Sequence, residues 1–479
     1  MNKKKFLIII ISFIFIFGFK FLPNIDGLSD SAMHVIGIFI GTLLLWINIA
    51  IDWPSILLIG TLATVDNLSM NSVIASSYGN STFVFLLFTF ILTYAFSKTT
   101  YINKIAYFFI NSRLSRKNLT SFICCYFGSI LLIGSIISPT VLFFVYLPIL
   151  EKIYDLLNIK KGDKLANVLM VGTVLMCGIS SGMTPIAHAF PIIAMGLYEE
   201  MYLTTISYTT YMTIGVIVGL LTAIVSIIIF KLYLRNYKLQ ITNNNIDLNV
   251  EEYNGEKIIL CVFCLCILLW ILPSIITTIL SNGIIYNIFN IIKSYGIVMP
   301  PLIGVVVLAI YHKDGKPLLN INDAMVNGVS WPSLIICAAT LALGSALTNT
   351  DIGITSFITN ELTPILSNYS VITMVFIFCL WAGIQTNLSS NLVTASLVTT
   401  ACLAITRNID GINIIGLVIL IGMLSSFSFA TPSAMPCVAI AISSEYTTSK
   451  HIMIFGFLII FIAILFATFI GYPLANLII

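Results

Sequence analysis

Ile137-Ser138-Pro139-Thr140 and Ser389-Ser390-Asn391-Leu392 are short polar clusters, and each interrupts a long apolar stretch of the chain. A second interruption follows each of them, Thr184-Pro185 in the first case and Ala430-Thr431-Pro432-Ser433 in the second. At the depth of a bilayer, unwound backbone is tolerated only where protein buries it or where it lines a wet cavity. Paired interruptions in corresponding segments of two halves indicate the binding site of a secondary transporter.

The composition is that of a membrane protein. Of the 479 residues, 59% are hydrophobic and 9% are charged, whereas soluble domains contain about 25% charged residues. Uncharged runs recur along the chain, and a spanning helix needs roughly 20 such residues. We predict an all-α polytopic membrane protein with about eleven transmembrane helices and two re-entrant hairpins. The basic start, Lys3-Lys4-Lys5, predicts an uncleaved first span with its N-terminus in the cytoplasm.

The two halves match each other at a nearly constant shift. A shift of 252 positions places Ser138 on Ser390, and past the loop 151–165 a shift of 245 places Pro191 on Pro436. Residues 98–117 contain five basic residues and no acid, while their counterpart, residues 351–370, contains two acids and no basic residue. The positive-inside rule therefore predicts a cytoplasmic first connector and an external second one. The halves are then inverted repeats, which favours alternating access.

These observations divide the chain into four parts. We predict an N-terminal span and external loop (1–33), a first inverted repeat (34–235), a cytoplasmic linker (236–257) and a second inverted repeat (258–479). Within the repeats, re-entrant hairpins are expected near 118–150 and 370–406, and broken helices near 166–198 and 412–444.

The interrupted regions carry no ionised side chain, and this limits their chemistry. An enzyme would need a nucleophile with a base or a metal cluster, and we find neither, so no enzymatic activity is predicted. The N–H groups at a helix N-terminus bind anions without Arg or Lys. Freed carbonyls, with Ser and Thr hydroxyls, can coordinate sodium. The pattern therefore predicts a carrier for a small anion accompanied by sodium.

Single residues carry less information than the four clusters together. An isolated Ser or Thr in a membrane helix is more often a packing residue than a ligand. His188 follows Thr184-Pro185, and three roles remain open for it. It is a hydrogen-bonded packing residue, a ligand contact, or a group that takes up a proton near neutral pH.

At these clusters the chain resembles the divalent anion/sodium symporter family of the ion-transporter superfamily. Members carry Ser-Asn-Thr at the tip of each of two re-entrant hairpins, followed by a Thr-Pro-rich segment. Here Ser390-Asn391 keeps two of the three residues, and Ser138-Pro139-Thr140 has Pro in place of Asn. The resemblance implies a homodimer in which a transport domain moves against a scaffold domain as an elevator. It also implies that both tips form the substrate site, flanked by two sodium sites.

The resemblance carries specific residues into the candidate site. The expected substrate contacts and walls are Ser138, Pro139, Thr140, Thr184, Pro185, His188, Ser390, Asn391, Thr431, Pro432 and Ser433. The expected sodium ligands are Ser135, Ser138, Gly182, Thr386, Asn391 and Ala430.

We expect a multi-pass protein of the cytoplasmic membrane that transports a di- or tricarboxylate or an inorganic anion and has no nucleic-acid partner. One alternative is a proton-coupled anion transporter or antiporter of the same superfamily that uses His188. A membrane enzyme acting on lipid carriers and an anion channel are the others.

Overall fold

The computed structural model describes residues 3–24, 27–235, 237, 255–296, 298–354, 357, 369–388, 390–407, 409–432 and 434–479. Their regular structure is helical apart from one short hairpin, in which β1 (His312–Lys313) pairs antiparallel with β2 (Lys316–Pro317). The predicted all-α class is therefore confirmed. Most of the predicted linker (236–257) and of the second connector (351–370) lies outside the described residues.

The helices follow one another closely along both halves of the chain. Those up to residue 235 are α1 (Lys3–Phe13), η1 (Ile14–Gly18), η2 (Phe19–Phe21), α2 (Asp30–Asn48), α3 (Asp52–Leu62), α4 (Met70–Ser76), α5 (Ser81–Ser97), α6 (Tyr101–Ile110), α7 (Leu119–Gly134), α8 (Pro139–Leu156), α9 (Lys164–Met183), α10 (Ala189–Tyr202) and α11 (Tyr208–Tyr233). Those after it are α12 (Glu256–Ile279), α13 (Ile284–Ser294), α14 (Met299–Ile310), α15 (Ile321–Asn327), α16 (Trp331–Thr348), α18 (Val371–Leu388), α19 (Asn391–Thr406), α20 (Ile414–Ser426), α21 (Pro436–Ser443), α22 (Ser449–Phe466), η3 (Ala467–Gly471) and α23 (Tyr472–Ile478).

Several of these helices are long and apolar enough to cross a membrane. The described residues contain six such helices, and nine spans result if three bent helix pairs each count as one. The bent pairs are α4 with α5, α13 with α14, and α15 with α16. The expected number of about eleven spans stays a prediction.

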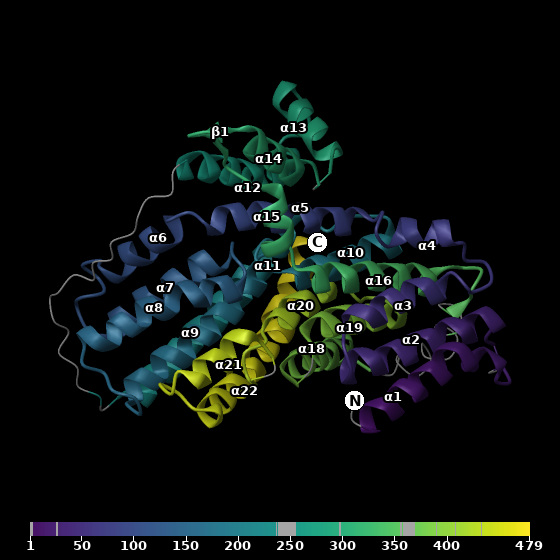
Figure 1. Cartoon of the computed structure of the whole chain (residues 1–479), viewed down its shortest axis with the longest axis horizontal. Helices are drawn as coiled ribbons and strands as arrows, with labels where there is room; N and C mark the ends of the chain where they lie inside the picture. Colours follow the sequence, from purple (N-terminus) through teal and green to yellow (C-terminus); the bar gives the residue numbers. More distant parts are fainter. Residues whose placement is uncertain are drawn as a thin grey trace.

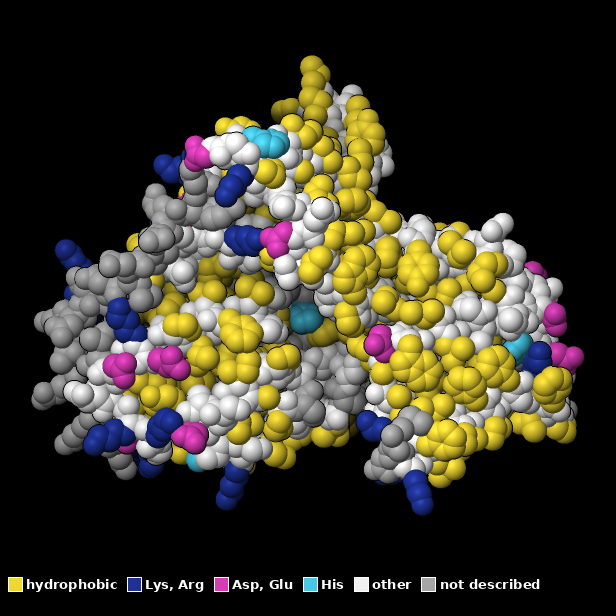
Figure 2. All heavy atoms as spheres, viewed as in Figure 1, with side chains coloured by type: hydrophobic (Ala, Val, Ile, Leu, Met, Phe, Trp, Pro, Cys, Tyr) yellow, Lys and Arg dark blue, Asp and Glu magenta, His cyan; other side chains and the backbone are white. Residues whose placement is uncertain are grey.

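The centre of the molecule is built from helices of both halves. All of the spanning window of α9 is buried, and so is α20 from Gly416 to Ser426. Helix α10 packs against α20, α19 and α16, while α9 packs against α7, α8, α11 and α20. Figure 1 shows α12, α13 and α14 projecting from this body, with α20 near its middle. Figure 2 shows apolar side chains spread over one face, which has a hollow near its centre.

The helices stop at the polar clusters. Helix α7 ends at Gly134 and α8 begins at Pro139, so Ser135 to Ser138 form the tip between them. Helix α18 ends at Leu388 and α19 begins at Asn391. Helix α9 breaks from α10 over residues 184–188, and α20 breaks from α21 over residues 427–435. Each interruption noted in the sequence is thus a break between two helices.

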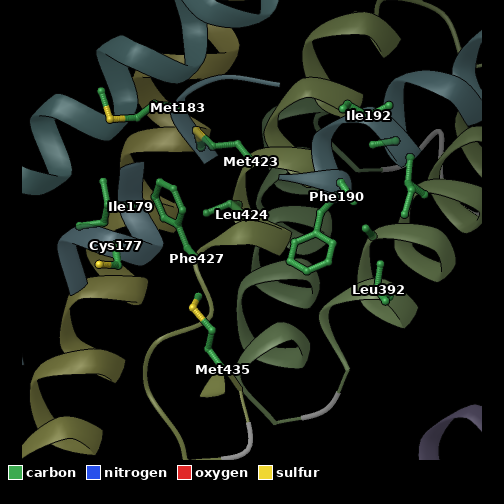
Figure 3. Packing of buried hydrophobic residues seen from close by; sticks show 14 of the residues in the cluster. Cys177, Ile179, Met183, Phe190, Ile192, Leu392, Met423, Leu424, Phe427 and Met435 are labelled. Atoms are coloured by element: carbon green, nitrogen blue, oxygen red, sulfur yellow. The ribbon is translucent and has the colours of Figure 1, made fainter. Parts of the chain in front are cut away.

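The two broken helices pack against each other with apolar side chains. Figure 3 shows Phe427, from the break after α20, lying between Ile179 of α9 and Leu424. The fit is close, because a Cβ added at Gly182 would lie 2.7 Å from the Phe427 ring and 2.7 Å from the Met423 carbonyl oxygen. Such packing holds the two breaks at a defined separation.

Candidate functional site

A cavity of about 300 Å³ lies where the tip between α7 and α8 faces α5, α15 and α16. Ser138, Pro139 and Thr140 line it from the tip, and His188 lines it from the break between α9 and α10. The opposite wall is formed by residues from α5 and from the α15–α16 region, namely Phe90, Thr93, Tyr94, Ser97, Asn327, Gly328, Ser330 and Ser333. The described lining contains no Asp, Glu, Lys or Arg.

Two helices begin at this cavity. Ser138 is the N-cap of α8, which starts at Pro139, and His188 is the N-cap of α10, which starts at Ala189. Pro fits this first helical position because its missing N–H would have no intrahelical partner there. Helix N-termini carry a partial positive charge of about half a unit each. The cavity can therefore attract an anion without an ionised side chain.

His188 is oriented by its own helix. Its Nδ1 accepts a hydrogen bond of 3.0 Å from the Ala189 N–H, and its ring lies 3.8 Å, centroid to centroid, from that of Phe190. Since Nδ1 is an acceptor, the proton of the neutral ring is on Nε2. His188 can thus offer a ligand one N–H donor while it caps α10.

An ion pair adjoins the wall of the cavity formed by α5 and α15. Lys98 forms an ion pair with Asp323. Asp323 also accepts hydrogen bonds from two lining residues, Tyr94 (3.0 Å) and Asn327 (2.7 Å). This network holds the wall opposite the tip, and the two charges offset each other.

The tip between α18 and α19 is bonded into the break after α20. The Asn387 side chain, which is fully buried, donates to the carbonyl oxygens of Gly383 and Phe427, both at 2.9 Å. Its Oδ1 accepts from the N–H groups of Phe429 (2.9 Å) and Ala430 (2.7 Å). Both the N–H groups and the oxygen of the Asn387 side chain therefore have hydrogen-bond partners, and these bonds hold the break after α20 against α18.

Asn391 and Thr386 add a second set of bonds at the same place. Asn391 Nδ2 donates to Ser428 Oγ at 2.8 Å and to the Ala434 carbonyl at 2.9 Å. Thr386 Oγ1 lies 3.0 Å from Asn391 Oδ1 and 2.6 Å from the Ser425 carbonyl oxygen. Several oxygens from separate segments thus lie close together in space, as the binding of a monovalent cation requires.

The expected residues fall into two groups. The cavity brings together Ser138, Pro139, Thr140 and His188. Thr184 lies beside them and donates a hydrogen bond to the Ser135 carbonyl, while Pro185 is buried in the turn that follows.

Of the half-two residues, Asn391 and Thr431 lie in the bonded network, and Ser390, Asn391, Thr431 and Pro432 are not among the residues lining this cavity. Ser390 is the N-cap of α19. Thr431 donates to the Asn387 carbonyl, and Pro432 is exposed. Ser433 lies outside the described residues.

The expected sodium ligands are also placed differently in the two halves. Thr386, Asn391 and Ala430 all contact the half-two network. In half one, the Gly182 carbonyl accepts a bond of 3.0 Å from the Tyr211 hydroxyl. The described residues contain no group of three or more His, Cys, Asp or Glu side chains arranged to hold a metal ion.

Sequence reasoning missed Asn387 and Tyr211. Asn387 had a detectable signal, because an amide in an apolar run just before the tip Ser390-Asn391 needs buried partners. Tyr211 had none, since a tyrosine within a long apolar helix is ordinary.

Broken helices around a cavity without ionised side chains are the features of a polytopic helical membrane transporter. The chain belongs to the family described as "Sodium:sulfate symporter transmembrane region", whose model matches residues 3–478. It is thus a multi-pass membrane protein of a transporter family. No curated protein matches the chain.

The fold is shared with a solved transporter. The YdaH transporter of Alcanivorax borkumensis, whose crystal structure is described as having an unusual topology, matches with a TM-score of 0.57. The match covers 93% of this chain and 98% of that chain, at 12% sequence identity.

Proposed function

We propose that the protein is a secondary active transporter that carries a small anion, an inorganic anion or a di- or tricarboxylate, together with sodium. The observation that supports this most directly is the start of α8 and of α10 at one cavity of about 300 Å³. Two helix N-termini, the Ser138 and Thr140 hydroxyls and the His188 ring supply donors for anionic oxygens. The family match points to the same class of substrate.

Sodium binds, in this proposal, beside the two tips. In half two the oxygens of Thr386, Asn391 and Ala430 are the candidates, and in half one those of Ser135, Ser138 and Gly182. The 3.0 Å contact between Thr386 Oγ1 and Asn391 Oδ1 supports the half-two site. A cation there would lie against the helix break and would offset part of the substrate's charge.

The transport cycle is alternating access by an elevator motion between inverted repeats. The tips and broken helices (α7–α10 and α18–α21) move with α11 and α22, and the remaining helices form the scaffold of a homodimer. The protein lies in the cytoplasmic membrane with its N-terminus and the basic connector 98–117 inside. The cavity, at the Lys98 end of α5, then opens toward the cytoplasm.

A proton-coupled mechanism is the second candidate. His188 lines the cavity, so a proton taken up by its ring could accompany the anion. Its Nδ1 already accepts a hydrogen bond from the Ala189 N–H. A proton on Nδ1 would remove this acceptor and with it the N-cap of α10. This geometry favours sodium.

The test is uptake into liposomes by the purified protein. A panel of sulfate, phosphate, dicarboxylates and tricarboxylates is offered with and without an inward sodium gradient. We expect at least one anion to accumulate in a sodium-dependent way. Uptake that is driven by a pH gradient and indifferent to sodium would favour the second candidate, and conversion of the substrate or channel-sized currents would contradict both.

A further inference from the structure

Helix α10 ends in two acids, and the second of them reaches other helices. Glu200 accepts a hydrogen bond of 2.8 Å from Asn80 Nδ2 and another from the side chain of Ser345 on α16. Asn80 is in turn the N-cap of α5, since its Oδ1 accepts from the Thr82 N–H at 2.8 Å. One carboxylate therefore joins α10, α5 and α16.

This contact and the cavity lie at opposite ends of the same two helices. Asn80 precedes the first residue of α5, whereas Thr93 and Ser97, near its last residue, line the cavity. The 17 residues of α5 span about 25 Å at 1.5 Å per residue. On α16, Ser333 near the start lines the cavity, and Ser345 is near the end. On both helices the cavity of about 300 Å³ lies at one end and the Glu200 contact at the other, where Ser81 and Thr82 of α5 line a separate cavity of about 460 Å³.

Helix α10 also packs closely against α5 and α16 at the end where Glu200 lies. A Cβ added at Gly196 would lie 2.5 Å from Thr82 Oγ1, and one added at Gly344 would lie 3.0 Å from Leu197 Cδ2. At these two positions the glycines let α10 pack closely against Thr82 and α16, beside a cavity of about 460 Å³ that Thr82 and Gly196 also line. Any movement of α10 along α5 and α16 must break the hydrogen bonds of Glu200.

The other half has an acid at the matching place, and its surroundings differ. Glu445 follows α21 at the shift of 245 positions that separates Pro191 from Pro436. It is exposed and forms an ion pair of 2.6 Å with Lys161, in the loop between α8 and α9. Helix α21 packs against α8 and α9, so Glu445 joins elements that belong to the proposed moving part. Glu200 alone of the two joins that part to the scaffold.

We propose that Glu200 is a positioning residue for the transport cycle: its carboxylate latches α10 to α5 and α16, and must release them before the Asn80 side can open. This rests on the alternating access proposed above. Glu200 contacts no substrate in this mechanism. It sets the rate at which the protein leaves the state in which the Asn80 side is closed.

The test measures the latched contact directly. Leu197→Cys and Gly344→Cys are introduced into protein whose exposed thiols, Cys124, Cys261 and Cys264, are changed to Ser. Disulfide formation is then timed in liposomes without substrate. We expect Glu200→Ala to slow cross-linking roughly fivefold or more, since bonds to a charged group are lost, and Glu200→Gln to restore much of the rate. The matched control is Glu199→Gln, because Glu199 faces a separate cavity.

The outcomes separate the latch from the transport function. Equal cross-linking rates with and without the Glu200 carboxylate would overturn the latch, even if sodium-driven uptake is found. Slower cross-linking in a protein that transports no anion would leave the latch standing and refute the proposed function. Ser345→Ala removes one partner without touching α10. It keeps the test decisive if Glu200→Ala does not fold, because we expect it to slow cross-linking as well.

Discussion

The two hairpin tips of the molecule differ in what holds them. The tip between α18 and α19 is bonded into its neighbouring helix break by two amides, Asn387 and Asn391. The tip between α7 and α8 has Pro139 in place of an amide, and it reaches its own break through one hydrogen bond, from Thr184 to the Ser135 carbonyl. The tip between α7 and α8 also lines the cavity. At the shift of 252 positions Ser135 stands where half two has Asn387 and Pro139 where it has Asn391, so the half-one tip lacks both amides that hold the other tip.

The largest effect is expected where the closed tip depends on one side chain. Asn387→Ala removes the partner of two buried N–H groups and two carbonyls. An unsatisfied buried donor costs about 1–3 kcal/mol, so we expect the apparent Tm to fall by several degrees and uptake to be lost. Thermal unfolding in detergent measures the first. Asn48→Ala is the control, since its amide bonds one carbonyl of its own exposed turn; an Asn387→Ala protein as stable as this control would show that the network is dispensable.

A smaller effect is expected at Asn391, which joins the tip of half two to the proposed sodium oxygens. Asn391→Ala should raise the sodium concentration needed for half-maximal uptake roughly tenfold, because both the Ser428 and Ala434 bonds disappear. Uptake at varied sodium measures this. Ser396→Ala on the same helix removes a buried hydroxyl that has no hydrogen-bond partner among the described residues, and it should leave the sodium dependence unchanged. A shift of equal size in both variants would refute a sodium role for Asn391.

Pro139→Asn would make the open tip resemble the closed one. The new amide would face the cavity that Pro139 lines, and a hydrogen bond to a charged oxygen is worth about 1.5–3 kcal/mol. We expect the KM for a carried dicarboxylate to fall roughly tenfold. Pro139→Ala separates loss of the ring from gain of the amide. A KM for Pro139→Asn no lower than that of Pro139→Ala would show that the tip does not contact the substrate.

The positions of the breaks were predictable from the sequence, and the bonds across them were not. Ser, Thr, Pro and Gly in an otherwise apolar run mark where a membrane helix stops, and the helices do end beside Ser138, Thr184 and Asn391. Whether a tip is bonded or open depends on which atoms of a distant segment meet it. The contact of Asn387 with Phe427 joins residues 40 positions apart, and no local pattern encodes it.

Two bends between neighbouring helices were also not predicted. Helix α15 meets α16 at 77°, and α13 meets α14 at 81°. Pro332 lies in the first turn of α16, but Pro is common at that position of helices in general and therefore does not indicate a bend. The inverted-repeat boundaries and the site residues as a set stay predictions.

His188 is expected to have a moderate effect on uptake, because its side chain caps the N-terminus of α10. His188→Ala removes the acceptor for the Ala189 N–H, and loss of an N-cap costs about 1 kcal/mol, so we expect uptake to fall roughly fivefold. His188→Asn, which can cap the same N–H, should restore much of it. Under the sodium proposal the pH profile of uptake between pH 5 and 8 keeps its shape in both variants. A profile that flattens in His188→Asn would support proton coupling instead.

The smallest effect is expected at the ion pair of Lys161 and Glu445. This pair lies outside the spans and joins two segments of the proposed moving part, the α8–α9 loop and the end of α21. The Lys161 ammonium lowers the pKa of Glu445, and Glu445 raises that of Lys161. The pair's stabilisation is therefore present at neutral pH and is lost as pH falls through the lowered pKa of Glu445. Both side chains are exposed, so salt screens them and the contribution is small. Lys161→Met should shift the apparent Tm by roughly 1 °C at low salt, and by less at pH 3 or in 0.5 M salt. A shift that survives both conditions would mean that Lys161 acts by packing, for which its position over the Tyr446 ring, 5.8 Å from the centroid, offers the contact.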